Sequence, residues 1–265
     1  MAEATQGRSG GIGSGPPVLS GLLAGRRMLV TGGASGIGAE VVETCSRMGA
    51  SGVVMDLPET SPGGSWPSMF GDVSDEAQVA TTVAAAADRL GGLDAVVAAA
   101  GIVPAWHLPD ELDLDEWDRV LAVNVRGVAA VIKHAAPVLT AGSAITVIGS
   151  LNSWRGDANI PAYVASKHAV LGVVRSAALA LGRSGIRVNA VAPGPIATAA
   201  LRLRMRSRAV ATGLSENQAL ARAADGTALG RLATTQDVAY TVAFLTSTLA
   251  GAITGALVPV DGGIL

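Results

Sequence analysis

Short apolar runs alternate with longer stretches of helix-forming residues along most of this 265-residue chain, and this alternation limits the possible folds more than any other feature. The apolar runs have the length of strands, and the stretches between them have the length of helices. Strands joined by helical crossovers pair in parallel, and parallel sheets are covered by helices on both faces. The predicted strands are residues 28–31, 53–56, 69–71, 94–99, 144–148, 188–191 and 256–260.

The alternation therefore predicts an α/β protein, with a doubly wound sheet of about seven parallel strands and helices on both faces. The predicted helices are residues 36–48, 76–90, 114–139, 162–183, 199–225 and 235–245. No internal repeat or linker interrupts residues 25–265, so we expect this part to form a single domain. Residues 1–24 contain six glycines and two prolines with little periodicity, which is typical of a flexible tail.

Charge and cysteine content exclude several classes of protein. A net charge of −2 argues against general nucleic-acid binding. No uncharged apolar run reaches membrane-spanning length, and the N-terminus lacks the apolar region of a signal peptide. Cys45 is the only cysteine and falls on an apolar helical face, so we expect no disulfide and no metal site. These features favour a cytoplasmic protein without a nucleic-acid or membrane partner.

A glycine-rich loop lies where the first predicted strand meets the first predicted helix. Glycine allows a tight turn and a close backbone approach to a phosphate, and a helix N-terminus offers free N–H groups to an anion. The loop is significant because it opens a β-α-β unit, as in a Rossmann fold. The residues predicted to bind a dinucleotide here are Gly32, Ser35, Gly36, Ile37 and Gly38.

An acidic residue ends the second predicted strand. Asp56 lies 18 residues beyond Gly38, where a carboxylate can bind the adenosine ribose hydroxyls, and Leu57 follows it. A carboxylate would repel the additional phosphate of NADP, and no Arg or Lys comes just after Asp56 to bind that phosphate. NAD is therefore favoured over NADP as the cofactor. The alternative is a solvated aspartate at a strand end.

Tyr163 and Lys167 are four residues apart in a predicted helix and so share one face of it. Such pairs are common, but Ser150 ends the preceding strand, 13 residues before Tyr163. Strand ends are where an open parallel sheet binds its ligands. The three residues are therefore predicted to form a catalytic site.

These motifs, taken in order, resemble the short-chain dehydrogenase/reductase family over essentially residues 25–265. The resemblance implies further cofactor contacts and a catalytic asparagine in addition to the serine, tyrosine and lysine. The additional matches are Asp72 and Val73 beside the adenine, Asn124 in a helix, and Pro193, Gly194, Ile196 and Thr198 near the nicotinamide.

One segment departs from the family pattern. After the fourth strand the family usually has Asn-Asn-Ala-Gly or Asn-Ala-Ala-Gly, whereas this chain has Ala98-Ala99-Ala100-Gly101. Ala99 and Gly101 are still expected to contact the cofactor. The usual asparagine chiefly braces the sheet, so its loss concerns local rigidity more than the chemistry.

The expected roles follow from acid–base chemistry. A free tyrosine has a pKa of about 10 and is a poor base near neutrality. The Lys167 ammonium and the positive nicotinamide both favour the phenolate, so Tyr163 can take the alcohol proton as hydride leaves. Ser150 is expected to bind the same oxygen, Lys167 to bind the nicotinamide ribose, and Asn124 to hold a proton-relaying water. An asparagine within a helix could instead bond to the backbone.

The substrate region is less constrained. Trp106, Trp154 and Met205 suit an apolar, cyclic substrate and equally suit ordinary packing, and Asn152 could bind a second substrate hydroxyl. Four arginines after Thr198 either attract an acidic substrate or form a salt-bridged surface, the latter being favoured. These are Arg202, Arg204, Arg206 and Arg208.

The sequence thus predicts an NAD-dependent oxidoreductase that interconverts a secondary alcohol, including a cyclic alcohol or a diol, and its ketone. Two alternatives remain: a carbonyl reductase, for example of 3-oxoacyl thioesters, and a non-catalytic dinucleotide-binding sensor. The resemblance also implies a homotetramer, or a dimer, in which the helices at 115–137 and 162–183 form one interface.

Overall fold

The computed structural model describes residues 20–60, 64–199, 201–202, 206 and 213–264, and these contain a sheet of seven parallel strands. The strand order is β3-β2-β1-β4-β5-β6-β7, so the doubly wound fold is confirmed. The strands are β1 (Arg27–Thr31), β2 (Ser51–Asp56), β3 (Ser68–Phe70), β4 (Leu93–Ala98), β5 (Leu139–Ile148), β6 (Arg187–Pro193) and β7 (Leu257–Val260).

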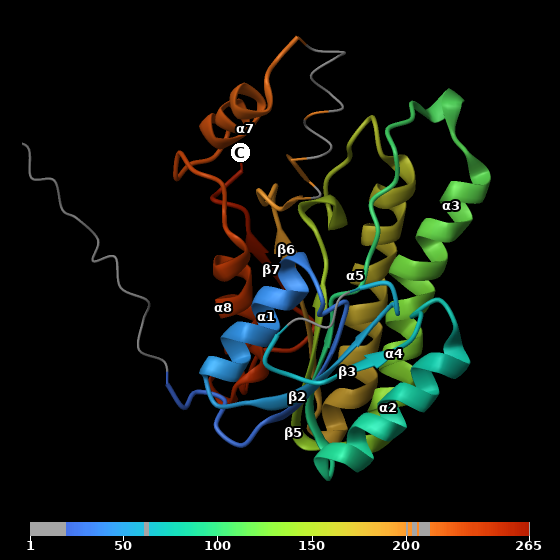
Figure 1. Ribbon diagram of the computed structural model, residues 1–265, viewed down its shortest axis with the longest axis vertical. Coiled ribbons are helices and arrows are strands. Elements are labelled where there is room, and N and C mark those ends of the chain that lie inside the picture. Colours follow the sequence, from blue (N-terminus) through green and yellow to red (C-terminus); the bar gives the residue numbers. More distant parts are fainter. Residues whose placement is uncertain (1–19, 61–63, 200, 203–205, 207–212, 265) are drawn as a thin grey trace, which may run out of the picture.

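Helices cover both faces of the sheet (Figure 1). On one face α1 packs against α8, and on the other lie α2, α4 and α5. Because both faces are covered, the central strands are apolar throughout rather than alternating. The helices are α1 (Gly36–Arg47), α2 (Glu76–Leu90), α3 (Leu114–Leu121), α4 (Val128–Ala135), α5 (Pro161–Leu181), α7 (Glu216–Asp225) and α8 (Thr235–Thr246).

The long helix predicted over residues 114–139 is interrupted in the structure. A π-helical segment, Ala122–Gly127, separates α3 from α4, and a 3₁₀ turn at Ala136–Val138 follows. Pro137 in that turn has no N–H and cannot continue the helix. Leu139 was therefore wrongly placed in the helix: it begins β5 and pairs with Leu93.

Two other predictions need correction. The helix predicted over residues 199–225 is not continuous, because residues 213–215 are not helical and Ser215 caps the start of α7 through Gln218. Most of the predicted tail, residues 1–19, lies outside the described residues. Residues 20–24 belong to the fold, since Leu23 is fully buried and its N–H donates to the Met48 carbonyl.

The α5 helix is the most apolar long helix among the described residues. With the turn after it, Pro161–Ser184 is long and apolar enough to cross a membrane by length and composition alone. Its apolar residues have another use here, because Val170, Val174 and Ala178 are buried in the core of the sheet layer. Packing on the sheet therefore accounts for the inner face of α5, whereas apolar residues such as Leu179 remain exposed on its outer face.

Candidate active site

All the residues predicted to bind the cofactor or act in catalysis lie at the carboxyl ends of the strands or on the helices that follow them. The order of the strands reverses direction between β1 and β4, which is where open α/β sheets bind ligands. Gly32 follows β1, Asp56 ends β2, Ala99 follows β4 and Ser150 follows β5. The remaining residues are on the same edge: Asp72 and Val73 follow β3, Gly101 follows β4, and Gly194, Ile196 and Thr198 follow Pro193 of β6.

The glycine-rich loop is packed too closely for side chains at two of its positions. A Cβ on Gly32, whose φ is +69°, would lie 2.6 Å from the backbone of Ala100. A Cβ on Gly38 would lie 2.0 Å from the Gly32 carbonyl oxygen. These glycines therefore let the loop fold down onto the start of α1 and the end of β4.

At Gly36 the same loop has free space beside its backbone. Gly36, with a φ of +56°, has no atom within 4 Å of the position a Cβ would take. The first N–H groups of α1 begin here, and the Ser35 side chain makes no capping hydrogen bond in the described part of the chain. An open glycine beside uncapped N–H groups fits the pyrophosphate of a dinucleotide.

The Asp56 carboxylate binds the backbone of the glycine-rich loop. Its Oδ2 accepts a hydrogen bond from the Ala34 N–H at 2.8 Å, and its Oδ1 accepts one from the Leu57 N–H at 2.8 Å. Each carboxylate oxygen has a further lone pair for a ribose hydroxyl. Asp56 therefore both fixes the glycine-rich loop and presents negative charge at the end of β2.

Tyr163 and Lys167 lie on the same face of α5, as their spacing predicts. The Lys167 Nζ is 5.5 Å from the centre of the Tyr163 ring and donates to the Ile148 carbonyl at 2.8 Å. Burial, which disfavours the charged form, lowers the pKa of Lys167 to about 8. The ammonium is thus held at the end of β5 and stays mostly charged at neutral pH.

Ser150 is fixed by the short turn that follows it. It caps a 3₁₀ turn, Leu151–Ser153, and its own N–H donates to Ser153 Oγ at 3.2 Å. The Ser150 side chain is buried. The turn places Ser150 at the end of β5, close to the carbonyl that holds Lys167.

Asn124 lies in the π-helical segment, and its side chain is fully buried and fully bonded. Its Oδ1 accepts from the Ile102 N–H at 2.9 Å, and its Nδ2 donates to the Ile102 carbonyl at 2.9 Å and to Ser166 Oγ at 3.1 Å. Ser166 Oγ in turn donates to the Tyr163 carbonyl at 2.7 Å. The side chain therefore ties the loop after β4 to the Tyr163 turn of α5, and the water predicted at Asn124 stays a prediction.

Ser166 is a residue of this network that the sequence pattern does not predict. A serine within a helix usually reads as a solvent-facing residue or a backbone-bonding one, and nothing in its spacing connects it to Asn124. The contact exists because α5 crosses the π-helical segment, which only the tertiary fold determines.

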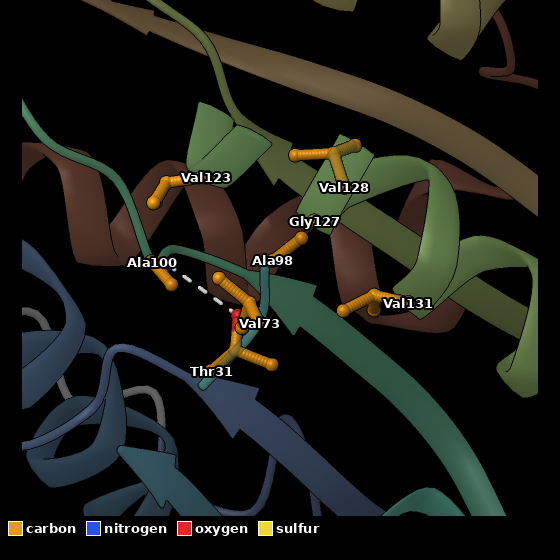
Figure 2. Close-up of a pocket in the computed structure, with 8 residues that line it drawn as sticks. All are labelled: Thr31, Val73, Ala98, Ala100, Val123, Gly127, Val128 and Val131. Carbon is orange, nitrogen blue, oxygen red and sulfur yellow. Dashed lines mark hydrogen bonds between the residues drawn. The ribbon is translucent and has the colours of Figure 1, made fainter. Parts of the chain in front are cut away.

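The alanine that replaces the family's usual asparagine lines a small apolar niche (Figure 2). Ala98 is buried, and the niche has no volume that a water molecule could enter. The Thr31 hydroxyl accepts a long hydrogen bond, 3.4 Å, from the Ala100 N–H across it. Valine packing therefore takes the place of an amide at this sheet end. The niche is lined by Thr31, Val73, Ala98, Ala100, Val123, Gly127, Val128 and Val131.

The arginines after Thr198 are paired where the structure describes them. Arg202 and Arg206 both bind Glu216, at 2.8 and 2.9 Å, which fits a salt-bridged surface better than a site for an acidic substrate. These arginines hold the pKa of Glu216 below its usual value. Arg204, Arg208 and Met205 lie outside the described residues.

The loop after β4 carries Trp106, which is 37% exposed, and Trp154 after the 3₁₀ turn is 42% exposed. Glu116 of α3 holds this loop, accepting from the Ala105 N–H at 3.1 Å and pairing with His107 at 3.4 Å. His107 is therefore part of a loop anchor.

Comparisons with known proteins agree with this geometry. The sequence profile described as "Enoyl-(Acyl carrier protein) reductase" matches residues 32–265. The chain is 38% identical to "Short-chain dehydrogenase reductase 3a" of Arabidopsis thaliana, covering 92% of this chain and 97% of that protein. It is 37% identical to cis-4-hydroxycyclohexanecarboxylate dehydrogenase of Sinomonas cyclohexanicum, covering 91% and 97%.

Among solved structures, the aldohexose dehydrogenase of Thermoplasma acidophilum superposes with a TM-score of 0.85 at 29% identity, covering 92% of this chain and 96% of that one. Fold, site and relatives together define an oxidoreductase that uses a nicotinamide dinucleotide and acts on alcohols or ketones. The chain belongs to the short-chain dehydrogenase/reductase family.

The burial of Lys167 predicts a pH dependence of stability. Its folded pKa of about 8 lies below the value of about 10.4 in an unfolded chain, so the unfolded state binds more protons between these pH values. Wild-type stability should therefore rise across this window relative to Lys167→Met, which cannot titrate. We expect the difference to grow by roughly 1–3 kcal/mol from pH 7 to pH 10, measured by urea unfolding at equal protein concentration. A difference that does not change with pH would contradict this assignment.

Proposed function

We propose that this protein is an NAD-dependent dehydrogenase that interconverts a secondary alcohol and its ketone, with Tyr163 as the acid/base. The observation that carries the proposal is the Lys167 ammonium, buried at the end of β5 and 5.5 Å from the Tyr163 ring centre. A buried positive charge at this distance favours the phenolate over the phenol. A phenolate is the form of tyrosine that can take a proton from an alcohol.

Each residue of the site has a separate role in binding the reacting oxygen, the proton or the dinucleotide. When bound, the dinucleotide supplies the hydride acceptor for oxidation and the hydride donor for reduction. Tyr163 Oη takes the hydroxyl proton in oxidation and returns it in reduction. Ser150 Oγ donates a hydrogen bond to the same oxygen and holds it against the tyrosine. Lys167 has two further N–H donors beyond the bond to Ile148, and these would hold the nicotinamide ribose.

The substrate is proposed to be largely apolar and cyclic. Trp154, next to the turn that Ser150 caps, and Trp106, in the loop after β4, offer partly exposed aromatic surface. The relative named for 4-hydroxycyclohexanecarboxylate points to a ring bearing a secondary hydroxyl. Arg202 and Arg206 are already paired with Glu216, so a carboxylate on the substrate is not part of the proposal.

NAD is proposed over NADP because Asp56 presents a carboxylate where the additional phosphate of NADP would lie. Its position is fixed by the N–H groups of Ala34 and Leu57. The alternative of a 3-oxoacyl thioester reductase is favoured only if the enzyme prefers NADPH.

A homotetramer and a cytoplasmic location complete the proposal. The outer faces of α4 and α5 form a shallow groove of small and apolar residues, and Leu179 of α5 is 84% exposed. Such a face suits a second copy of the chain. The sequence has a single cysteine, Cys45, and so cannot form an internal disulfide, which suits a reducing compartment.

Replacing Tyr163 by Phe removes the hydroxyl that carries the proton and keeps the ring. We expect turnover to fall by roughly 10²–10⁴-fold or more while NADH binding, followed by nucleotide fluorescence, is retained. Tyr240→Phe, at the other tyrosine of the chain, is the matched control and should leave turnover unchanged. Undiminished turnover by Tyr163→Phe would exclude the mechanism.

Replacing Asp56 by Asn removes the charge and keeps an oxygen for the Ala34 N–H. The ratio of kcat/KM for NAD+ to that for NADP+ should fall by about tenfold or more, because like-charge repulsion of the phosphate is lost. Steady-state kinetics with both cofactors measures this ratio. A ratio that stays the same in Asp56→Asn would show that Asp56 does not select the cofactor.

The α4/α5 face predicts the outcome of a mass measurement. Light scattering should give four times the chain mass of 26.3 kDa. Gly172 lies in the groove with nothing within 4 Å of its Cβ position, so Gly172→Arg should fold but yield a smaller species. A wild-type mass equal to one chain would refute the assembly.

A further inference from the structure

The side chain of Asn152 contacts the hydroxyl of Ser150. Asn152 lies in the 3₁₀ turn that Ser150 caps, two residues further along the chain. Its backbone N–H donates to Ser150 Oγ at 3.1 Å, and Ser150 Oγ donates to Asn152 Oδ1 at 3.4 Å. The amide of Asn152 therefore lies beside the group that holds the reacting oxygen.

The Ser150 hydroxyl has only one proton, and two acceptors compete for it. In the proposed reaction this proton goes to the reacting oxygen of the substrate. In the structure it goes to Asn152 Oδ1, at a distance longer than the usual 2.7–2.8 Å or so for such bonds, so the contact is weak and easily exchanged. Once Ser150 turns to the substrate, Asn152 Oδ1 loses its donor.

The side-chain amide of Asn152 also carries hydrogen-bond donors, the two N–H groups of Nδ2. Its Nδ2 makes no hydrogen bond to any residue that the structure describes, and the residue is only half-buried. An amide with a vacated acceptor and two unused N–H groups is suited to a hydroxyl, which donates and accepts. Leaving such a group unpaired once a substrate excludes water from it has a cost in free energy.

We propose that Asn152 binds a second hydroxyl, on the carbon next to the reacting carbon. The substrates favoured by this enzyme are then vicinal diols, and the products are α-hydroxy ketones. The second hydroxyl donates to Asn152 Oδ1 in place of Ser150 and accepts from Nδ2, which releases the Ser150 proton for the reacting oxygen. This inference rests on the proposed function and specifies its substrate class.

The spacing of the two protein groups limits where the second hydroxyl can be. Ser150 Oγ and Asn152 Oδ1 are 3.4 Å apart, so two neighbouring substrate oxygens can bind them at the same time. Hydroxyls on adjacent carbons have this spacing, and they are the pair that the proposal names. The neutral amide also fits a neutral hydroxyl better than an anionic group.

The test compares 1,2-cyclohexanediol, as its cis and trans isomers, with cyclohexanol, all with NAD+. For wild type, kcat/KM should be at least about tenfold higher for one diol isomer than for cyclohexanol, because a site with polar groups left unpaired discriminates against the alcohol that lacks the second hydroxyl. In Asn152→Leu, which has a similar shape but no polar atoms, this ratio should fall towards one. The matched control Asn217→Leu, on an exposed face of α7, should keep the wild-type ratio.

The outcomes separate the two proposals. Equal kcat/KM for diols and cyclohexanol in wild type, or a diol preference that survives in Asn152→Leu, overturns the role of Asn152 and leaves the dehydrogenase function standing. Turnover of none of the three alcohols overturns the proposed function itself, and the role of Asn152 with it. Nucleotide binding and thermal melting of each variant show that a changed ratio does not come from misfolding.

Discussion

The parallel pairing of β4 between β1 and β5 is the constraint on which the rest of the structure depends. Thr31, Ala98 and Val147 lie in one row across these strands, so the loops that follow them begin at the same edge. At the opposite end Arg27 binds Asp94 at 2.8 Å and holds the pKa of that carboxyl below its usual range. This register brings the glycine-rich loop against Ala100, and the pairing of β4 with β5 starts the loop after β4 and the Ser150 turn at the same edge. A shift of one residue would turn every side chain of β4 to the other face.

The buried lysine at this edge of the sheet lowers the free energy of unfolding. Lys167 is buried, and no carboxylate in the described part of the chain pairs with it; its bond to the Ile148 carbonyl offsets only part of the desolvation. Asn124, by contrast, is buried with every polar atom bonded. The site therefore combines a hydrogen-bonded amide, which fixes the backbone, with a buried amine that lies 5.5 Å from the centre of the Tyr163 ring.

Much of this arrangement could be predicted from the sequence, because it depends on local patterns. The strands, the glycine-rich loop and the helical spacing of Tyr163 and Lys167 each follow from a few neighbouring residues. The π-helical segment, the start of β5 at Leu139 and the Ser166–Asn124 contact could not be predicted, because each depends on how distant elements pack. The Ala98 niche belongs to this second group: its closure requires valines from three separate segments, such as Val73, Val123 and Val131.

The central claim is that this chain carries out hydride transfer on a secondary alcohol. The most direct test is the absorbance of NADH after purified protein is mixed with NAD+ and a panel of secondary and cyclic alcohols. We expect NADH formation from at least one of these alcohols, with slower turnover when NADP+ replaces NAD+. Binding of both dinucleotides without reduction of either, on every alcohol of the panel, would contradict it and would favour a non-catalytic dinucleotide sensor.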